Sequence, residues 1–225
     1  MRRTLLPLVL LIAAGCGGST TPAPDEISFT TPIHVATNGL AMQASDVRFE
    51  VRGGVEDQRA LMTIPITRFD VALDVGADRA TLTDLTVLIG NMNVPSETLP
   101  PVGLPLRDLK LGVVPPVRLG IGTRTPDLVA LTANVPLELA WELELKDGTH
   151  YPLGPARTGA LPLDIVVARD GAGAERVTVD VGCKGVCWEL TGIVTVRDLW
   201  VHADVPVAVE PATGRAAVLD DGLVQ

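Results

Sequence analysis

The chain has 225 residues, and its 27 Asp and Glu residues outnumber its 18 Lys and Arg residues, which gives a formal net charge of −9 at pH 7. This acidity, without a basic stripe interleaved with aromatic residues, excludes nucleic-acid binding. A mean hydropathy of +0.33 shows that the chain can bury a core, which excludes global disorder.

Residues 1–15 have the layout of a secretory signal peptide. Met1-Arg2-Arg3 is followed by an apolar run from Leu5 to Ala14 and then by Gly15 and Cys16. The apolar run is too short to span a bilayer as a stable helix. We therefore expect export from the cytoplasm, with the leader removed.

The segment Ala13-Ala14-Gly15-Cys16 resembles the lipobox of bacterial lipoproteins. The resemblance implies cleavage before Cys16, a diacylglycerol on its sulfur and an acyl chain such as palmitate on its new amine. Gly17 stands where enteric lipoproteins retained in the inner membrane carry Asp, so by the same resemblance the outer membrane is expected, with the domain facing the periplasm or the cell surface. The alternative is an ordinary signal peptide that leaves Cys16 as a thiol.

Residues 16–26 are expected to form the lipidated cysteine and a flexible tether, because the segment is small, polar and contains proline. Loss of Arg2 and Arg3 with the leader lowers the formal charge from −9 to −11. Anionic headgroups repel such a domain, so membrane attachment is expected through the acyl chains and not through a basic patch.

Residues 27–211 are expected to form a single β domain, followed by a C-terminal tail at 212–225. Apolar residues recur with period two, which is typical of half-buried strands. The clearest example runs from Val135 to Leu145, with apolar residues on one face and Glu138, Glu142 and Glu144 on the other. Asp147-Gly148 then predicts a two-residue hairpin turn. The fold class is all-β: an antiparallel sandwich of about ten strands, or a curved, partly closed sheet.

Two local patterns predict irregularities in these strands. Prolines between apolar residues are expected at strand starts, edges or bulges, and they are Pro65, Pro105, Pro136, Pro162 and Pro206. A motif of apolar-x-Asp-Leu-x-apolar breaks the period as a bulge would, at 82–87, 106–111 and 196–201. Segments 106–119 and 196–209 align without gaps, which suggests two related halves; similarity through Val and Leu content alone is the alternative.

Cys183 and Cys187 are left as a pair once Cys16 is lipidated, and in an oxidising compartment a disulfide between them is the leading interpretation. A redox role would need C-x-x-C at a helix start, and zinc would need two more ligands, so no metal or cofactor is expected.

The sequence contains no recognisable catalytic set. His34, His150 and His202 are scattered, and Ser19, Ser28, Ser45 and Ser96 stand outside any G-x-S-x-G motif. Gly171 to Arg176 begins like a dinucleotide fingerprint but opens no helix, and is expected to be a turn. The outer-face glutamates are expected to be solvated. Trp141, Trp188 and Trp200 are expected to pack in the core, with a ligand pocket as the alternative.

We therefore expect a noncatalytic, membrane-anchored lipoprotein whose β domain binds or scaffolds an envelope component, either a protein or a hydrophobic ligand such as a lipid. No residue of the sequence identifies the ligand site. The alternative is a periplasmic hydrolase with an active site on loops.

Overall fold

The computed structural model describes residues 27–37, 43–53, 58–94, 104–190 and 194–212. These residues form twelve antiparallel strands of one sheet and no helix, so the all-β prediction is confirmed. No membrane-spanning helix is found in the described ranges. The strands are β1 (Ile33–Thr37), β2 (Gln43–Gly53), β3 (Gln58–Pro65), β4 (Arg68–Val75), β5 (Ala80–Val94), β6 (Leu104–Gly112), β7 (Val117–Thr125), β8 (Leu128–Glu144), β9 (His150–Arg169), β10 (Glu175–Gly182), β11 (Val186–Leu190) and β12 (Val194–Pro211).

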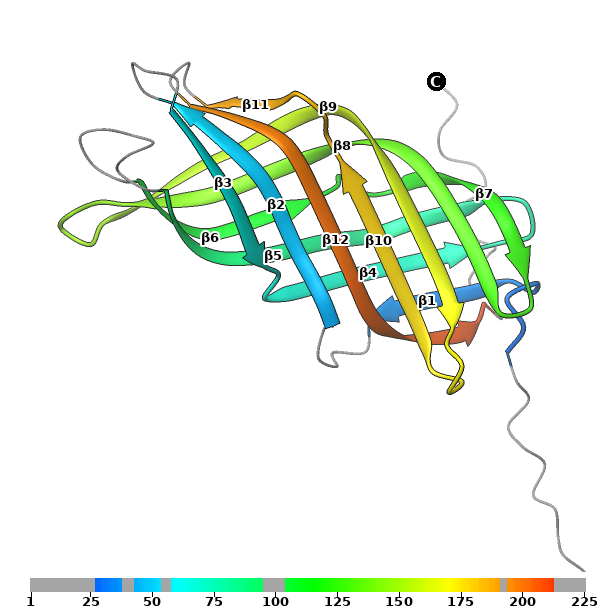
Figure 1. Cartoon of the computed structure of the whole chain (residues 1–225). Coiled ribbons are helices and arrows are strands. Elements are labelled where there is room, and N and C mark those ends of the chain that lie inside the picture. The colour runs from blue at the N-terminus through cyan, green and yellow to red at the C-terminus, as the bar shows by residue number, and fades with distance from the viewer. Residues whose placement is uncertain (1–26, 38–42, 54–57, 95–103, 191–193, 213–225) are drawn as a thin grey trace, which may run out of the picture.

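Eight of the strands close into an antiparallel barrel, in the order β1-β4-β5-β6-β8-β9-β10-β12, with β12 paired back to β1 (Figure 1). The other four strands lengthen positions of this ring. β1 and β2 pair with successive stretches of one side of β12, and β10 and β11 pair with successive stretches of its other side. In the same way, β6 and β7 pair with successive stretches of β8. β3 and β4 share the remaining position, next to β2 and β1. The ring thus has eight positions, visited in chain order as an up-and-down meander.

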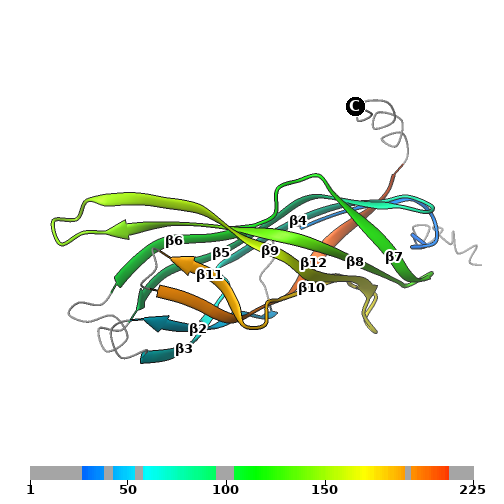
Figure 2. The same ribbon diagram turned by 90° about the horizontal axis from the view of Figure 1, so that it is seen from above.

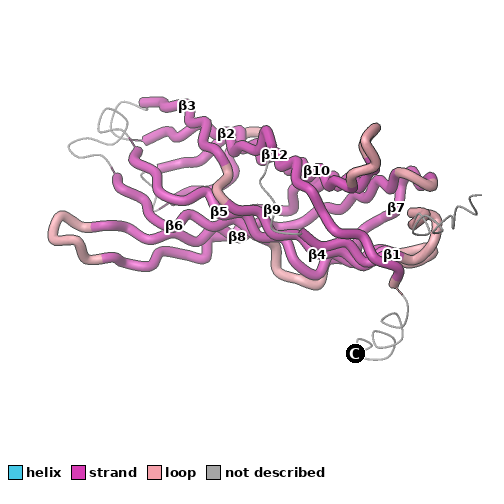
Figure 3. The backbone as a smooth tube through the Cα atoms, turned by 90° about the horizontal axis from the view of Figure 1, so that it is seen from below, coloured by secondary structure: helices cyan, strands magenta, loops and turns pink. Residues whose placement is uncertain are grey.

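The barrel is closed at one end and divided at the other (Figures 2 and 3). At the divided end the sheet separates into two jaws. The first jaw consists of residues 88–94, 104–112, 136–144 and 150–162, and the second of residues 43–53, 58–65, 186–190 and 194–200. Two seams separate the jaws. In the described part of the chain no ladder joins β3 to β5 at the first seam or β9 to β11 at the second.

The chain enters and leaves at the closed end. Arg124 donates hydrogen bonds to the carbonyl oxygens of Phe29, Thr31 and Gly76, and Arg169 donates to that of Ile27. At the other terminus, Ala212 N donates to Pro32 O over 3.0 Å. The entry and exit segments are therefore held together, at the end opposite the jaws (Figure 1).

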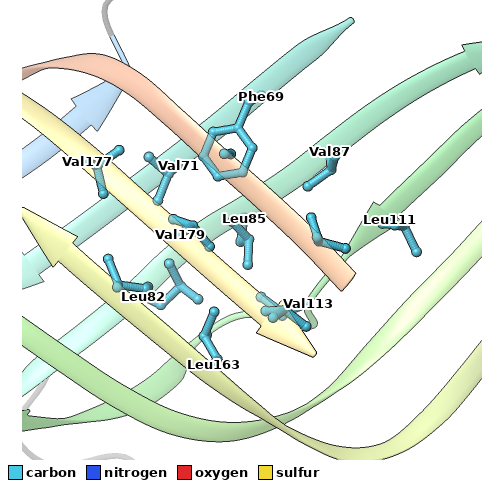
Figure 4. Close-up of a cluster of buried hydrophobic side chains, with 14 of the residues drawn as sticks. Phe69, Val71, Leu82, Leu85, Val87, Leu111, Val113, Leu163, Val177 and Val179 are labelled. Atoms are coloured by element: carbon cyan, nitrogen blue, oxygen red, sulfur yellow. The ribbon is translucent and has the colours of Figure 1, made fainter. Parts of the chain in front are cut away.

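The barrel interior is filled by the apolar faces of the strands (Figure 4). Val177 and Val179 of β10 and Leu163 of β9 are almost completely buried, as the period-two pattern predicts. An interior cavity at mid-barrel, beside Leu85 and Val181, has a volume of only about 10 Å³. That is at most the space for one water molecule, so the middle of the barrel is a packed core.

All three predicted bulges are present. The β4–β5 register shifts between Ala72 and Leu73, and the ladders of β6 and β12 shift beside Asp108 and Asp198. Both aspartates have positive φ, 50° for Asp108 and 48° for Asp198. Each bulge restores the buried face, because Leu109 and Leu199 are buried three residues after Leu106 and Val196.

Segments 106–119 and 196–209 occupy equivalent places in the ring. The first lies in the fourth position, β6 and β7, and the second in the eighth, β12, half a turn away and with the same chain direction. Each Asp bulge also adjoins a left-handed glycine on the preceding position: Gly90 pairs with Leu109, and Asp198 N donates to Gly185 O. This arrangement is the one that two related halves require.

The hairpin turns differ from the prediction in length. Leu145 N donates to Thr149 O and Gly148 N to Leu145 O, so the loop contains three residues and not two, with Gly148 left-handed. The turn after Asp170 has the same form, with Gly173 left-handed. Most of the singled-out prolines lie as expected: Pro65 ends β3, Pro105 is the second residue of β6, Pro136 adjoins a register shift, and Pro162 lies beyond the last β9–β10 pair.

Candidate functional site

A cleft of about 600 Å³ opens at the base of the second seam. Its walls are residues 159–162 of β9, residues 182–187 around the β10–β11 connection and residues 198–200 of β12. Leu161 and Leu199 belong to the buried core, whereas Trp200 and Val186 are about half exposed, at 47% and 48%. The cleft therefore leads from the outer surface to the core between the jaws.

Comparison of the two seams explains why this cleft exists. In the first seam, β4 and β5 stay paired as far as Arg68 and Leu88, and Thr67 adds two hydrogen bonds to Leu88 O, from its backbone N at 2.8 Å and its Oγ1 at 2.9 Å. In the second seam, pairing of β9 with β10 ends at Leu163 and Val181.

The residues that would continue the second ladder do not do so. The next pair would be Pro162 with Gly182, and Pro162 has no N–H to donate, whereas the β10 side stays bonded to β12 through Cys183 N and Leu199 O at 2.8 Å. Small residues also line this wall: a Cβ added at Gly159 would meet nothing within 4 Å. The second seam therefore opens at the level where Thr67 closes the first.

The connection between β10 and β11 is closed by the predicted disulfide between Cys183 and Cys187. Asp198 Oδ1 accepts a hydrogen bond from Gly185 N at 2.8 Å, which fixes this loop to the bulge of β12. Lys184 is exposed at the rim of the cleft. One cationic and one acidic side chain, Lys184 and Asp198, thus line a mainly apolar cleft.

Trp200 corrects the expectation that the tryptophans pack in the core. It projects from the outer face of β12 and covers Gly182, where an added Cβ would lie 3.3 Å from its ring. Trp141 is buried, as expected, and the side chain of Trp188 lies outside the described part of the structure. The bulge at Asp198 moves Leu199 inward and so turns Trp200 outward.

A second apolar surface lies at the tip of the first jaw. β8 and β9 project as a hairpin beyond the other strands (Figure 3). Leu143 and Tyr151 are opposite each other in the ladder, so they share the face that is buried further down the hairpin. Tyr151 is 52% exposed and Leu145 is 40% exposed. We call Leu143, Leu145 and Tyr151 the tip surface.

The three histidines do not meet but each binds a carboxylate on a neighbouring strand. His34 Nδ1 lies 2.8 Å from Asp74 Oδ1, His202 Nδ1 lies 2.7 Å from Asp180 Oδ1, and His150 Nδ1 lies 2.9 Å from Glu142 Oε2. The outer-face glutamates are also paired, Glu138 with Arg157 and Glu144 with Arg107. Cross-strand charge pairs of this kind are a feature of a solvated outer surface.

The described residues bring no nucleophile to a histidine. Ser28 Oγ bonds to Thr30, and Ser45 Oγ accepts from Asp204 N. Within the described ranges no three His, Cys, Asp or Glu side chains are gathered as a metal site needs. Cys16, Ser19 and Ser96 lie outside the described residues.

Two aspartates in hairpin turns have lowered pKa values. Hydrogen bonds from the backbone N–H groups of Ala174 and Ala172 lower the pKa of Asp170, and those from Thr149 lower the pKa of Asp147. Both carboxylates are exposed and accept hydrogen bonds from N–H groups of their own turns, which is a structural role.

Comparison with known proteins gives no relative: no protein-family model matches the chain, and no curated protein or solved structure is significantly similar to it. Sequence reasoning identified no ligand site, and the cleft was missed because it depends on where a ladder ends. The available signal was the run of small residues at Gly159-Ala160 and Gly182 beside a proline and a cysteine loop.

Proposed function

We propose that this protein is a noncatalytic, lipid-anchored binding module of the bacterial envelope, which contacts another envelope component with its jaw end. Cys16 is the proposed anchor, and residues 17–26 are the proposed tether to the closed end of the barrel. The outer membrane is the proposed location, on the basis of the resemblance at Cys16 and Gly17.

The observation that carries this proposal is that the two ends of the barrel differ. The chain enters at the closed end, where Arg124 and Arg169 bind the backbone of residues 27–31. Leu61, Leu145 and Tyr151, which are exposed large apolar residues, belong to the jaws. Exposed apolar surface marks contact sites, and an anchor on Cys16 would leave this surface facing away from the membrane that holds it.

The dimensions fit a contact at a distance. β9 has 20 residues, and at a rise of roughly 3.3 Å per residue it is about 65 Å long. The cavity that the described residues enclose at mid-barrel has a volume of only about 10 Å³, so binding is proposed at the surfaces of the jaw half.

Metabolic labelling tests the anchor. Bacteria that express the full chain are fed an alkyne analogue of palmitate, and label on wild type is compared with label on Cys16→Ala. We expect labelled wild-type protein in the membrane fraction and unlabelled variant protein. Label that persists in Cys16→Ala, or none on wild type, would overturn the anchor.

Photo-crosslinking in cells tests the contact end. A photoreactive amino acid is placed at Tyr151 in the tip surface and, as a matched control, at exposed Gly171 in the closed-end turn. We expect a discrete adduct from position 151 and none from position 171. Equal adducts from both positions, or none from position 151, would contradict a jaw-end contact.

A further inference from the structure

We infer that the cleft of the second seam binds a single unbranched alkyl chain with an anionic head group, as in a fatty acid. The inference rests on the proposed function only in treating the protein as a binding module of the envelope, and it concerns a site separate from the tip surface.

The size and lining of the cleft fit such a chain. A volume of about 600 Å³ is within the range of small-molecule sites. The inner wall is the buried pair Leu161 and Leu199, and Val186 and Trp200 flank the mouth. A flexible, narrow apolar ligand that lies in this open cleft would cover Leu161 and Leu199 and lose part of its own contact with water.

The equivalent site of the other half argues that the opening is specific to this seam. There, Thr67 bonds to Leu88 and Pro65-Ile66 stand where β9 carries Gly159-Ala160. Both seams lie beside an Asp bulge and a left-handed glycine, and the first seam is nevertheless closed by Thr67. These two features therefore do not by themselves open a seam. The second seam instead combines small residues with a ladder that stops.

The strand edge that borders the cleft favours an alkyl chain over an extended peptide. An added peptide strand would need backbone donors and acceptors along β9 beyond Leu163, where β10 no longer pairs with it. That stretch contains Pro152, Pro155 and Pro162, each of which lacks a donor. An alkyl chain needs burial but no hydrogen bonds.

Charge at the mouth selects the head group. Lys184 and the acidic Asp198 are both exposed in the cleft lining, and one carboxylate oxygen of Asp198, Oδ1, accepts a hydrogen bond from Gly185 N. In a chain with a net charge of −9, the Lys184 ammonium is the group of the cleft lining that would attract an anionic head group, in competition with Asp198 beside it.

The test uses the full chain with Cys16→Ser, purified without detergent, so that neither attached acyl chains nor detergent compete. Calorimetry measures binding of saturated fatty acids of increasing length. We expect the Kd to fall by up to about fourfold for each added methylene, until the chain exceeds the cleft. A Kd that does not depend on chain length would overturn the inference without any variant.

Two substitutions locate the site. Gly159→Phe fills the cleft, and Gly171→Phe, which also meets open space but lies at the closed end, is the matched control. We expect palmitate binding to weaken by more than roughly tenfold in Gly159→Phe and to be unchanged in Gly171→Phe. Equal affinity in both variants, with unchanged circular dichroism, would place the chain elsewhere.

Two further measurements concern the mouth of the cleft. Dibromopalmitate should quench tryptophan fluorescence in the parent chain, and most of this quenching should be lost in Trp200→Phe. Lys184→Glu should weaken palmitate binding about two- to fivefold and leave hexadecanol binding unchanged. Equal effects on acid and alcohol would remove the anionic head group from the inference.

If no fatty acid binds at all, the cleft inference fails, while palmitate labelling and crosslinking still report separately on the proposed function.

Discussion

At the residue scale, the two bulges depend on aspartates in a conformation that few side chains adopt. Asp108 and Asp198 have φ near 50°, in the left-handed region, which costs most residues about 1–2 kcal/mol. Asn and Asp tolerate it best among the non-glycine residues. The side chain of Asp198 is held by a hydrogen bond from Gly185 N, on the preceding ring position. Backbone geometry thus explains the aspartate in two of the three copies of the motif, whereas Asp84 in the third copy does not have positive φ.

Asp198→Ala should therefore destabilise the fold by about 1–2 kcal/mol, because it removes a hydrogen bond and leaves an alanine in the left-handed region. Asp198→Asn keeps an acceptor oxygen, and Asn also tolerates the left-handed region, so this variant should lose much less stability. Urea unfolding of the two variants measures the difference. Equal losses in both would show that the hydrogen bond and the φ angle do not matter here.

The turn carboxylate of Asp170 makes stability depend on pH in the acidic range. Its pKa in the folded chain is lowered from 3.8 by the N–H groups of Ala174 and Ala172, so the ionised form stabilises the fold. That contribution is complete above the ordinary value of 3.8 and is lost as pH falls through the lower, folded pKa.

Asp170→Asn cannot ionise, so the difference in unfolding free energy between wild type and this variant should shrink as pH falls below about 4. Denaturation at a series of pH values from 7 to 2 measures it. A difference that stays constant over this range would contradict the assignment of the lowered pKa to the folded turn.

At the element scale, the barrel divides into two jaws where one ring position is made of two separate strands. β10 and β11 share one position and are separated by the loop that Cys183 and Cys187 close. β10 pairs with both β9 and β12, whereas β11, after the loop, pairs with β12 and has no ladder to β9. The disulfide restricts this loop in the unfolded chain as well.

Replacing both cysteines with Ser should cost about 2 kcal/mol in the chain-entropy description of so short a loop. The expected loss is modest because β12 still pairs with β10 and β11 on either side of the loop. Chemical unfolding of the oxidised chain and of the double variant, under the same buffer, measures it. A loss well above this value would mean that the disulfide also maintains native contacts of the jaws.

The strands and bulges were predictable from sequence because both follow from local periodicity. The stretch from Val135 to Leu145 and the last strand show their buried faces directly, and the Asp-Leu motif shows where the period changes. The cleft was not predictable in this way, since it depends on β9 losing its partner at Leu163. Exposure of Trp200 also depends on a neighbour across the sheet, Gly182, which the local pattern of β12 does not reveal.

At the scale of the whole molecule, one core is shared by the barrel and the jaws. Leu163 is completely buried among side chains of both halves of the chain, whereas Leu61 on the edge strand β3 is 80% exposed. A shared core of this kind favours unfolding in a single transition.

Leu163→Ala should cost about 2–5 kcal/mol, because a cavity forms where the surrounding sheet cannot collapse. Leu61→Ala, the same change at an exposed site, should alter stability by no more than about 0.5 kcal/mol. Thermal unfolding followed by circular dichroism measures both. Similar losses at the two sites would contradict the described burial.

The pairing of β1 with β12 makes the sequence a closed ring in space. Ile33 is opposite Pro211, so the first and the last ring positions are hydrogen-bonded neighbours. Such a ring tolerates new chain ends at exposed turns, and the turn between β8 and β9 is one of these. A circular permutant that joins the two old ends and begins at Asp147 should adopt the same barrel, with both of its new ends emerging from the tip of the β8–β9 hairpin.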